Sequence, residues 1–122
     1  MKRRTVIFER FAVLRVPFPF TDSDATKNRP ALVISNASSF NTAAGHSVMA
    51  MITSEGNPPW PLECSLADLN AGGLPAPSKV RFKLFTLDHR LVRGQLGRLS
   101  LADRLTVRDG LAKLLGDFAP NV

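Results

Sequence analysis

The stretch Val16–Ser35, VPFPFTDSDATKNRPALVIS, organises the rest of the chain. It opens with two prolines alternating with two phenylalanines. This pattern favours an extended strand end, because proline fixes φ and lacks an N–H donor. A polar loop is expected over Thr21–Asn28, followed by a short buried strand over Ala31–Ser35. Arg29 is therefore predicted to lie where this loop meets a rigid strand, held by Pro30.

An arginine fixed in this way can present a planar fork of donors to a phosphate or a carboxylate. A surface arginine at the start of a strand would show the same pattern. Both interpretations of Arg29 stay open until the rest of the chain is considered.

Length and composition predict a single domain over residues 1–122. Mean hydropathy is zero, and no apolar run reaches the roughly 18 residues that a membrane span needs. The basic start MKRRTVIFER has no long apolar segment, so no signal peptide is expected. Cys64 is the only cysteine, which excludes an internal disulfide and a multi-cysteine metal site. We expect a cytoplasmic protein with Cys64 as a small buried side chain.

The net charge of +6 favours an anionic partner. Residues 1–29 carry seven Lys or Arg, residues 30–78 carry none, and residues 79–113 carry nine. If the two ends of the chain fold together, they form a basic surface beside a neutral one. Nucleic acid binding is one explanation and solubility is another.

Alternating hydrophobicity and turn residues predict short strands and one helix. The expected strands are Phe11–Val16, Ala31–Ser35, His46–Thr53, Leu62–Leu66, Ser78–Leu84 continuing to Val92, and Gln95–Leu99. The segment Asn36–Gly45 is small and polar and is expected to be a loop. The strand from Ser78 is expected to expose Lys79, Arg81 and Lys83 on one face.

A helix is predicted after Ser100, a serine N-cap with an acid, Asp103, three residues on. Gly116 is expected to end it. Its apolar residues cover about half of the circumference: Leu101, Leu105, Val107, Leu111, Ala112, Leu114 and Leu115. The fold class is therefore mainly β with one C-terminal helix, in a small curled antiparallel sheet or barrel. An exposed edge of such a sheet favours pairing into a dimer.

Familiar catalytic motifs are missing: the sequence has no P-loop, GxGxxG, HExxH or GxSxG. Asp22–Asp24 begins like a calcium loop, but the later ligands are absent, so a solvated turn is expected. His46 and His89 are a possible acid–base pair, although nothing in the sequence brings them together.

The remaining groups are Arg29, Thr53, Ser54 and the basic strand, and they suit metal-free cleavage of RNA. In that reaction the 2′-hydroxyl of the substrate attacks phosphorus. A rigid arginine can stabilise the negative charge that develops there, and Thr53, at a strand end, can orient the 2′-hydroxyl. Neither group is a good base at neutral pH, so modest rates are expected.

Several segments together resemble the MazF/PemK family of bacterial toxins. They are PFPFTD, KNRPALVIS, MITS, GLPAPSKV, FTLDHRL and the final helix, which cover about Phe8 to Gly116. The resemblance implies an SH3-like barrel of short antiparallel strands that acts as a homodimer. It also implies a sequence-preferring endoribonuclease on single-stranded RNA that needs no metal or cofactor and leaves a 2′,3′-cyclic phosphate.

The same resemblance places the family's arginine on Arg29 and its threonine on Thr53. It further implies a cognate antitoxin whose extended tail occupies the RNA groove. We expect the RNA-binding residues to be Lys27, Ser54, Lys79, Arg81 and Lys83, with Trp60 either stacking on a base or capping the core.

The chain departs from the family pattern at two places. Phe11-Ala12 stands where relatives carry an acidic pair, and Phe82–Thr86 replaces a segment that contributes an acid and an arginine in some members. Two alternatives therefore remain: a non-catalytic nucleic-acid-binding protein, or a gyrase inhibitor of the same fold.

Overall fold

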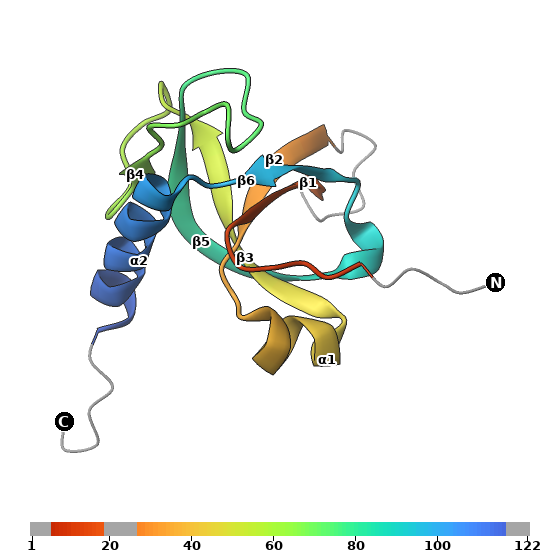
Figure 1. Cartoon of the computed structure of the whole chain (residues 1–122). Coiled ribbons are helices and arrows are strands. Elements are labelled where there is room, and N and C mark those ends of the chain that lie inside the picture. Colours follow the sequence, from red (N-terminus) through yellow and green to blue (C-terminus); the bar gives the residue numbers. More distant parts are fainter. Residues whose placement is uncertain (1–5, 19–26, 117–122) are drawn as a thin grey trace, which may run out of the picture.

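The computed structural model describes residues 6–18 and 27–116 (Figure 1). Most of the predicted polar loop, including Asp22–Asp24, lies outside the described residues. The strands are β1 (Ala12–Phe18), β2 (Lys27–Val33), β3 (His46–Ser54), β4 (Cys64–Ser65), β5 (Ser78–Asp88) and β6 (Gln95–Arg98). The helices are α1 (Thr42–Ala44) and α2 (Leu101–Leu115).

The six strands form one sheet in the order β4-β5-β3-β2-β1-β6, and every pairing is antiparallel. The sheet curls strongly, and α2 packs beside β4 and β5 (Figure 1). The predicted class, mainly β with one C-terminal helix, is confirmed. No helix in the described part of the chain is long and apolar enough to span a membrane.

Alternate residues of the strands enter two apolar clusters, as the two-residue period of a strand requires. The first cluster lies under α2 and includes Val13, Leu32, Ala50, Ile52, Val80, Phe82 and Val107. The second includes Leu14, Val16, Ala31, Val33, Met49 and Leu87. Because both faces of the central strands are buried, β1 to β3 form a rigid base for the residues at their ends.

The second strand begins earlier than predicted. β2 starts at Lys27, because β1 pairs with it as far as Phe18 opposite Lys27. Arg29 therefore lies within a paired strand and not at its entrance. Because Arg29 pairs with Val16 of β1, its backbone is fixed, as expected.

The segment Asn36–Gly45 is not the predicted loop. It forms a π-helical turn at Ala37–Asn41 and then α1. Asn36 caps the turn by accepting from the backbone N–H of Ser39 at 2.8 Å, and the buried Asn41 amide donates to Phe8 O at 2.7 Å. Local hydrogen bonding by asparagine thus creates helical turns that composition alone does not reveal.

The strand from Ser78 ends at Asp88, not at Val92 as predicted, and a 3-10 turn follows at His89–Leu91. Within β5 the pairing to β3 shifts by two residues: Ala50 pairs with Leu84, whereas Met51 pairs with Arg81. This bulge breaks the alternation that the sequence suggested.

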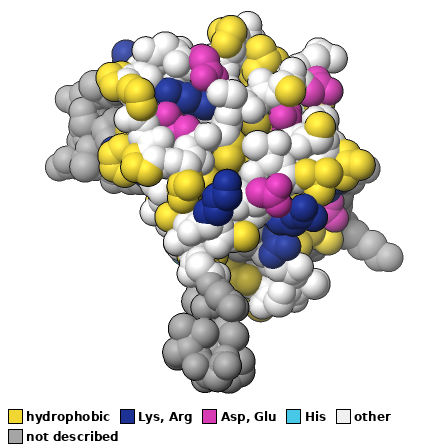
Figure 2. All heavy atoms as spheres, turned by 90° about the vertical axis from the view of Figure 1, so that its left-hand side faces the viewer, with side chains coloured by type: hydrophobic (Ala, Val, Ile, Leu, Met, Phe, Trp, Pro, Cys, Tyr) yellow, Lys and Arg dark blue, Asp and Glu magenta, His cyan; other side chains and the backbone are white. Residues whose placement is uncertain are grey.

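The helix α2 begins and ends as predicted, with Ser100 as N-cap and Gly116 as C-cap. Its buried side is different: Asp103, Val107 and Gly110 face the sheet. Four of the leucines expected in the core are exposed, namely Leu101, Leu105, Leu114 and Leu115. Figure 2 shows the face that carries α2, where hydrophobic patches alternate with charged side chains.

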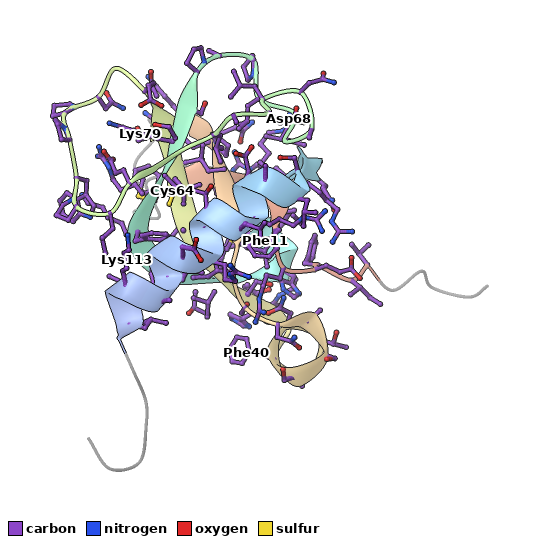
Figure 3. The ribbon with its side chains drawn as sticks, turned by 60° about the vertical axis from the view of Figure 1, so that its left-hand side comes forward. Phe11, Phe40, Cys64, Asp68, Lys79 and Lys113 are labelled. Atoms are coloured by element: carbon purple, nitrogen blue, oxygen red, sulfur yellow. The ribbon has the colours of Figure 1, made fainter. Side chains whose placement is uncertain are left out.

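Two side chains explain how α2 is seated. Asp103 accepts hydrogen bonds from the backbone N–H groups of Ala67 and Asp68, each at 2.9 Å. Its carboxylate therefore ties the helix to the connection after β4. Cys64 lies buried between α2 and the sheet (Figure 3), and burial raises the pKa of its thiol. The prediction of a small buried cysteine is confirmed.

Candidate functional site

The ends of β2 and β3 bring Arg29 and Thr53 together. The ladder between these strands ends at the pair Ala31–Met51, and Arg29 and Thr53 each lie two residues beyond that pair. Both residues, together with Ser54, line a cavity of about 180 Å³. The structure therefore joins the two residues that the sequence selected on chemical grounds.

The cavity is also lined by the connection before β5 and by the first residue of that strand: Leu74, Pro75, Ala76, Pro77 and Ser78. Its backbone is held at several points: Leu74 N donates to Leu69 O at 2.9 Å, and Glu55 N donates to Pro77 O at 3.0 Å. Because proline also fixes φ, this wall is rigid. The site is a preformed notch where two central strands of the sheet, β2 and β3, end.

Arg29 is exposed, and its guanidinium lies 6.0 Å from the centre of the Phe18 ring. Within residues 6–18 and 27–116, no carboxylate forms an ion pair with it. Arg29 also lines the cavity with Thr53, so its guanidinium group can reach an anion bound there. An exposed guanidinium group fits both interpretations of Arg29, and the cavity that it lines with Thr53 is the feature that an anion-binding role requires.

Thr53 is half-buried, and its hydroxyl oxygen accepts a hydrogen bond from the side-chain amide of Asn57. Asn57 itself closes a turn, since its backbone N–H donates to Ser54 O at 3.1 Å. Asn57 was not selected from the sequence, because it lies in a loop of prolines and small residues.

The prediction that Lys79, Arg81 and Lys83 form an exposed face of β5 is wrong for Lys79 and Arg81. Lys79 Nζ lies 2.9 Å from Glu63 Oε1, and Arg81 Nε lies 2.7 Å from Glu63 Oε2. Both cations are turned inward because Glu63, from the loop before β4, needs partners once it is buried. Figure 3 shows Lys79 on β5 beside that loop.

The pKa of Glu63 reflects this environment. Burial by itself raises the pKa, but hydrogen bonds from Lys79, Arg81 and the backbone N–H of Trp60 outweigh it and lower the pKa to about 2. Glu63 is thus ionised at neutral pH. One carboxylate thus binds both Lys79 and Arg81, two of the three cations that were expected to face a nucleic acid.

Lys83 stays exposed, as expected, with its ammonium 4.6 Å from the centre of the Trp60 ring. Trp60 is 42% exposed and belongs to neither apolar cluster, so it does not cap the core. Lys27 is also exposed, two residues before Arg29 on the same strand. Lys83 and Trp60 together offer an exposed cationic and aromatic surface.

The two histidines come closer than the sequence suggested. His46 and His89 line one cavity of about 330 Å³, because the start of β3 pairs with the end of β5. His89 Nε2 lies 2.7 Å from Ser47 Oγ, and burial lowers the pKa of its ring. Six residues of β3 separate His46 from Thr53, and the two cavities share no lining residue. This cavity is therefore distinct from the notch that Arg29 and Thr53 line.

No group of three or more His, Cys, Asp or Glu side chains in the described part of the chain is arranged to hold a metal ion.

Comparison with known proteins places the chain in a family. The sequence profile described as PemK-like, MazF-like toxin of type II toxin-antitoxin system matches residues 9–115. Comparison with curated protein sequences gives no match.

Several solved structures share the fold. An endoribonuclease in complex with its cognate antitoxin from a mycobacterial species has a TM-score of 0.71 at 20% identity, covering 95% of this chain and 100% of that chain. MazE–MazF from Deinococcus radiodurans has a TM-score of 0.71 at 26% identity, covering 91% and 98%. MazF from the same organism has a TM-score of 0.71 at 24% identity, covering 93% and 100%. The chain belongs to the PemK-like, MazF-like toxins of type II toxin–antitoxin systems.

Proposed function

We propose that this toxin is a cytoplasmic, metal-independent endoribonuclease that cleaves single-stranded RNA at preferred sequences. The observation that carries the proposal is the shared cavity of Arg29 and Thr53 at the ends of β2 and β3. Solved structures of the same fold include one described as an endoribonuclease with its antitoxin, which supports this choice of activity.

The proposed reaction is an attack of the ribose 2′-oxygen on the adjacent phosphorus. The bond from phosphorus to the 5′-oxygen breaks, the 2′-proton is lost, and the leaving oxygen gains a proton. The product is a 2′,3′-cyclic phosphate. Arg29 faces the phosphate and stabilises the charge that grows on its oxygens, while the Thr53 hydroxyl orients the reacting group. Neither side chain is an efficient base at neutral pH, so the rate is modest.

The RNA contacts divide into direct and indirect ones. Lys27, Ser54 and Lys83 are proposed to touch the RNA, because all three are exposed and Ser54 lines the notch itself. Lys79 and Arg81 are bound to Glu63, so we now propose that they support the site instead of contacting phosphate. Trp60 is proposed to offer a stacking surface for a base.

The proposed partners are a second copy of the chain and a cognate antitoxin. The sheet ends on two edge strands, β4 and β6, and α2 exposes leucines, which supports association with another copy. Sedimentation of the purified chain tests this: a species of twice the 13.3 kDa chain mass is expected, and a monomer at micromolar concentration contradicts it.

The activity is tested by incubating the purified protein with a long single-stranded RNA in the presence of EDTA. Cuts at a recurring sequence with 2′,3′-cyclic phosphate ends are expected. Binding of an uncleavable RNA should weaken steeply with salt, because phosphate contacts release counterions. No cleavage by the folded protein would favour a non-catalytic binding protein or a gyrase inhibitor.

A further inference from the structure

The loop between β3 and β4, residues 55–63, is held in one conformation by charged side chains. Lys79 Nζ donates to Asn57 O at 2.8 Å, and Arg81 Nη2 donates to Pro58 O at 2.7 Å. Glu63 completes the arrangement by accepting from both cations and from Trp60 N, the last at 2.9 Å. Each cation therefore binds one carbonyl oxygen of the loop and also the carboxylate of Glu63.

This loop is also fixed where it leaves β3. Glu55 N donates to Pro77 O at 3.0 Å, and Glu55 Oε1 accepts from Ser65 Oγ at 2.8 Å. Asn57 follows Glu55 by two residues, and its own carbonyl is held by Lys79. Its side chain is therefore held over the end of β3, where its amide nitrogen donates to Thr53 Oγ1.

The direction of that hydrogen bond has a chemical consequence. A threonine hydroxyl has one proton to donate and two lone pairs with which to accept. Because Thr53 Oγ1 accepts from Asn57, its own proton is free to point elsewhere. Within residues 6–18 and 27–116, no acceptor takes that proton, and Thr53 lines the notch that also holds Arg29.

We propose that Asn57 is a positioning residue that makes Thr53 a hydrogen-bond donor toward the substrate. This inference rests on the proposed ribonuclease function. The strongest acceptor in a scissile phosphodiester is a non-bridging phosphate oxygen, which gains negative charge in the transition state. By donating to that oxygen, Thr53 orients the phosphate for attack and, beside Arg29, stabilises its charge. The ionic cluster of Glu63, Lys79 and Arg81 keeps Asn57 in place.

A purely structural role for Asn57, closing the turn after β3, predicts different behaviour. In that case any substitution acts through stability, and its effect does not depend on the Thr53 hydroxyl. Asn57→Asp separates the two roles, because a carboxylate only accepts hydrogen bonds and draws the Thr53 proton toward itself. Asn57→Ala leaves that proton free but no longer directed.

The added charge of Asn57→Asp needs a matched control. Gly56→Asp places the same charge on the neighbouring residue, and a Cβ there meets nothing within 4 Å. This variant reports what a carboxylate in the loop does to RNA binding without reaching the Thr53 hydrogen bond. Thermal unfolding of all variants shows whether each is folded.

The experiment measures single-turnover cleavage of RNA, and RNA affinity, for wild type, Asn57→Asp, Asn57→Ala and Gly56→Asp, each also combined with Thr53→Ala. We expect the cleavage rate constant of Asn57→Asp to fall about 10- to 100-fold below that of Gly56→Asp at similar affinity. Asn57→Ala should lose less. In the Thr53→Ala background the difference between the two aspartate variants should vanish.

Equal rate constants for Asn57→Asp and Gly56→Asp, with an active wild type, overturn the inference alone. So does a difference that persists without the Thr53 hydroxyl. A wild-type protein that cuts no RNA overturns the proposed function and this inference with it.

Discussion

Glu63 Oε2 lies 2.7 Å from Arg81 Nε across the loop that joins β3 to β4, and only 10% of the Glu63 side chain is exposed. The same carboxylate binds Lys79. From the sequence, β5 was expected to bind phosphate through Lys79, Arg81 and Lys83. In the structure, Lys79 and Arg81 instead hold the loop beside Thr53 in place. The predictions below follow from this arrangement and from the packing around it.

The first prediction concerns the stability supplied by Glu63. Glu63→Gln leaves Lys79 and Arg81 largely buried without a counter-charge, so the free energy of unfolding should fall by about 3 kcal/mol. Urea unfolding measures it. Glu55→Gln is the matched control, since Glu55 is exposed, and should change stability by about 0.5 kcal/mol or less. Equal effects of the two substitutions would contradict the role given to Glu63.

The second prediction concerns acid. The folded-state pKa of Glu63, about 2, lies below its usual value of 4.5, so the unfolded state binds more protons between these values. The stabilisation is therefore complete above about pH 4.5 and is lost as pH falls toward 2. The carbon chemical shift of the Glu63 carboxyl group, followed by NMR, should titrate near pH 2. A midpoint near 4.5 would show that the cluster does not form.

The choice of Arg29 and Thr53 was possible from the sequence, since their chemistry and the family resemblance both point to them, but that they line one cavity is known only from the structure. The cluster around Glu63 was not predictable. Lys79 and Arg81 alternate with apolar residues as exposed side chains do, and only the path of the proline-containing loop brings Glu63 to them.

For the helix α2, too, one feature was predictable from the sequence and another was not. Its caps, Ser100 and Gly116, were predictable from residue type. Its buried side was not, because the close approach of Gly110 to the sheet, and the hydrogen bonds of Asp103, decide the rotation of the helix more than its leucines do. Tertiary contacts of this kind leave no periodic signal in the sequence.

The third prediction concerns that close approach. A Cβ at position 110 would lie 2.8 Å from Phe82 Cε2 and 3.0 Å from Cys64 Sγ. Gly110→Ala should therefore destabilise the fold by about 1–3 kcal/mol, although alanine favours helices. Thermal or urea unfolding measures the change.

Leu101→Ala serves as the comparison for this helix, because Leu101 is 70% exposed and its loss should change monomer stability by about 0.5 kcal/mol or less. If Gly110→Ala stabilises the protein instead, α2 does not pack on the sheet through its glycine.

The central claim is that Arg29 and Thr53 together cleave RNA, and the most direct test is the single-turnover cleavage rate of Arg29→Ala and Thr53→Ala in EDTA. Each variant should lose about 100-fold or more in rate. Arg90→Ala, which removes an exposed arginine from the distant histidine cavity, should keep the wild-type rate. If Arg29→Ala cleaves as fast as Arg90→Ala, the notch that Arg29 and Thr53 line is not the active site.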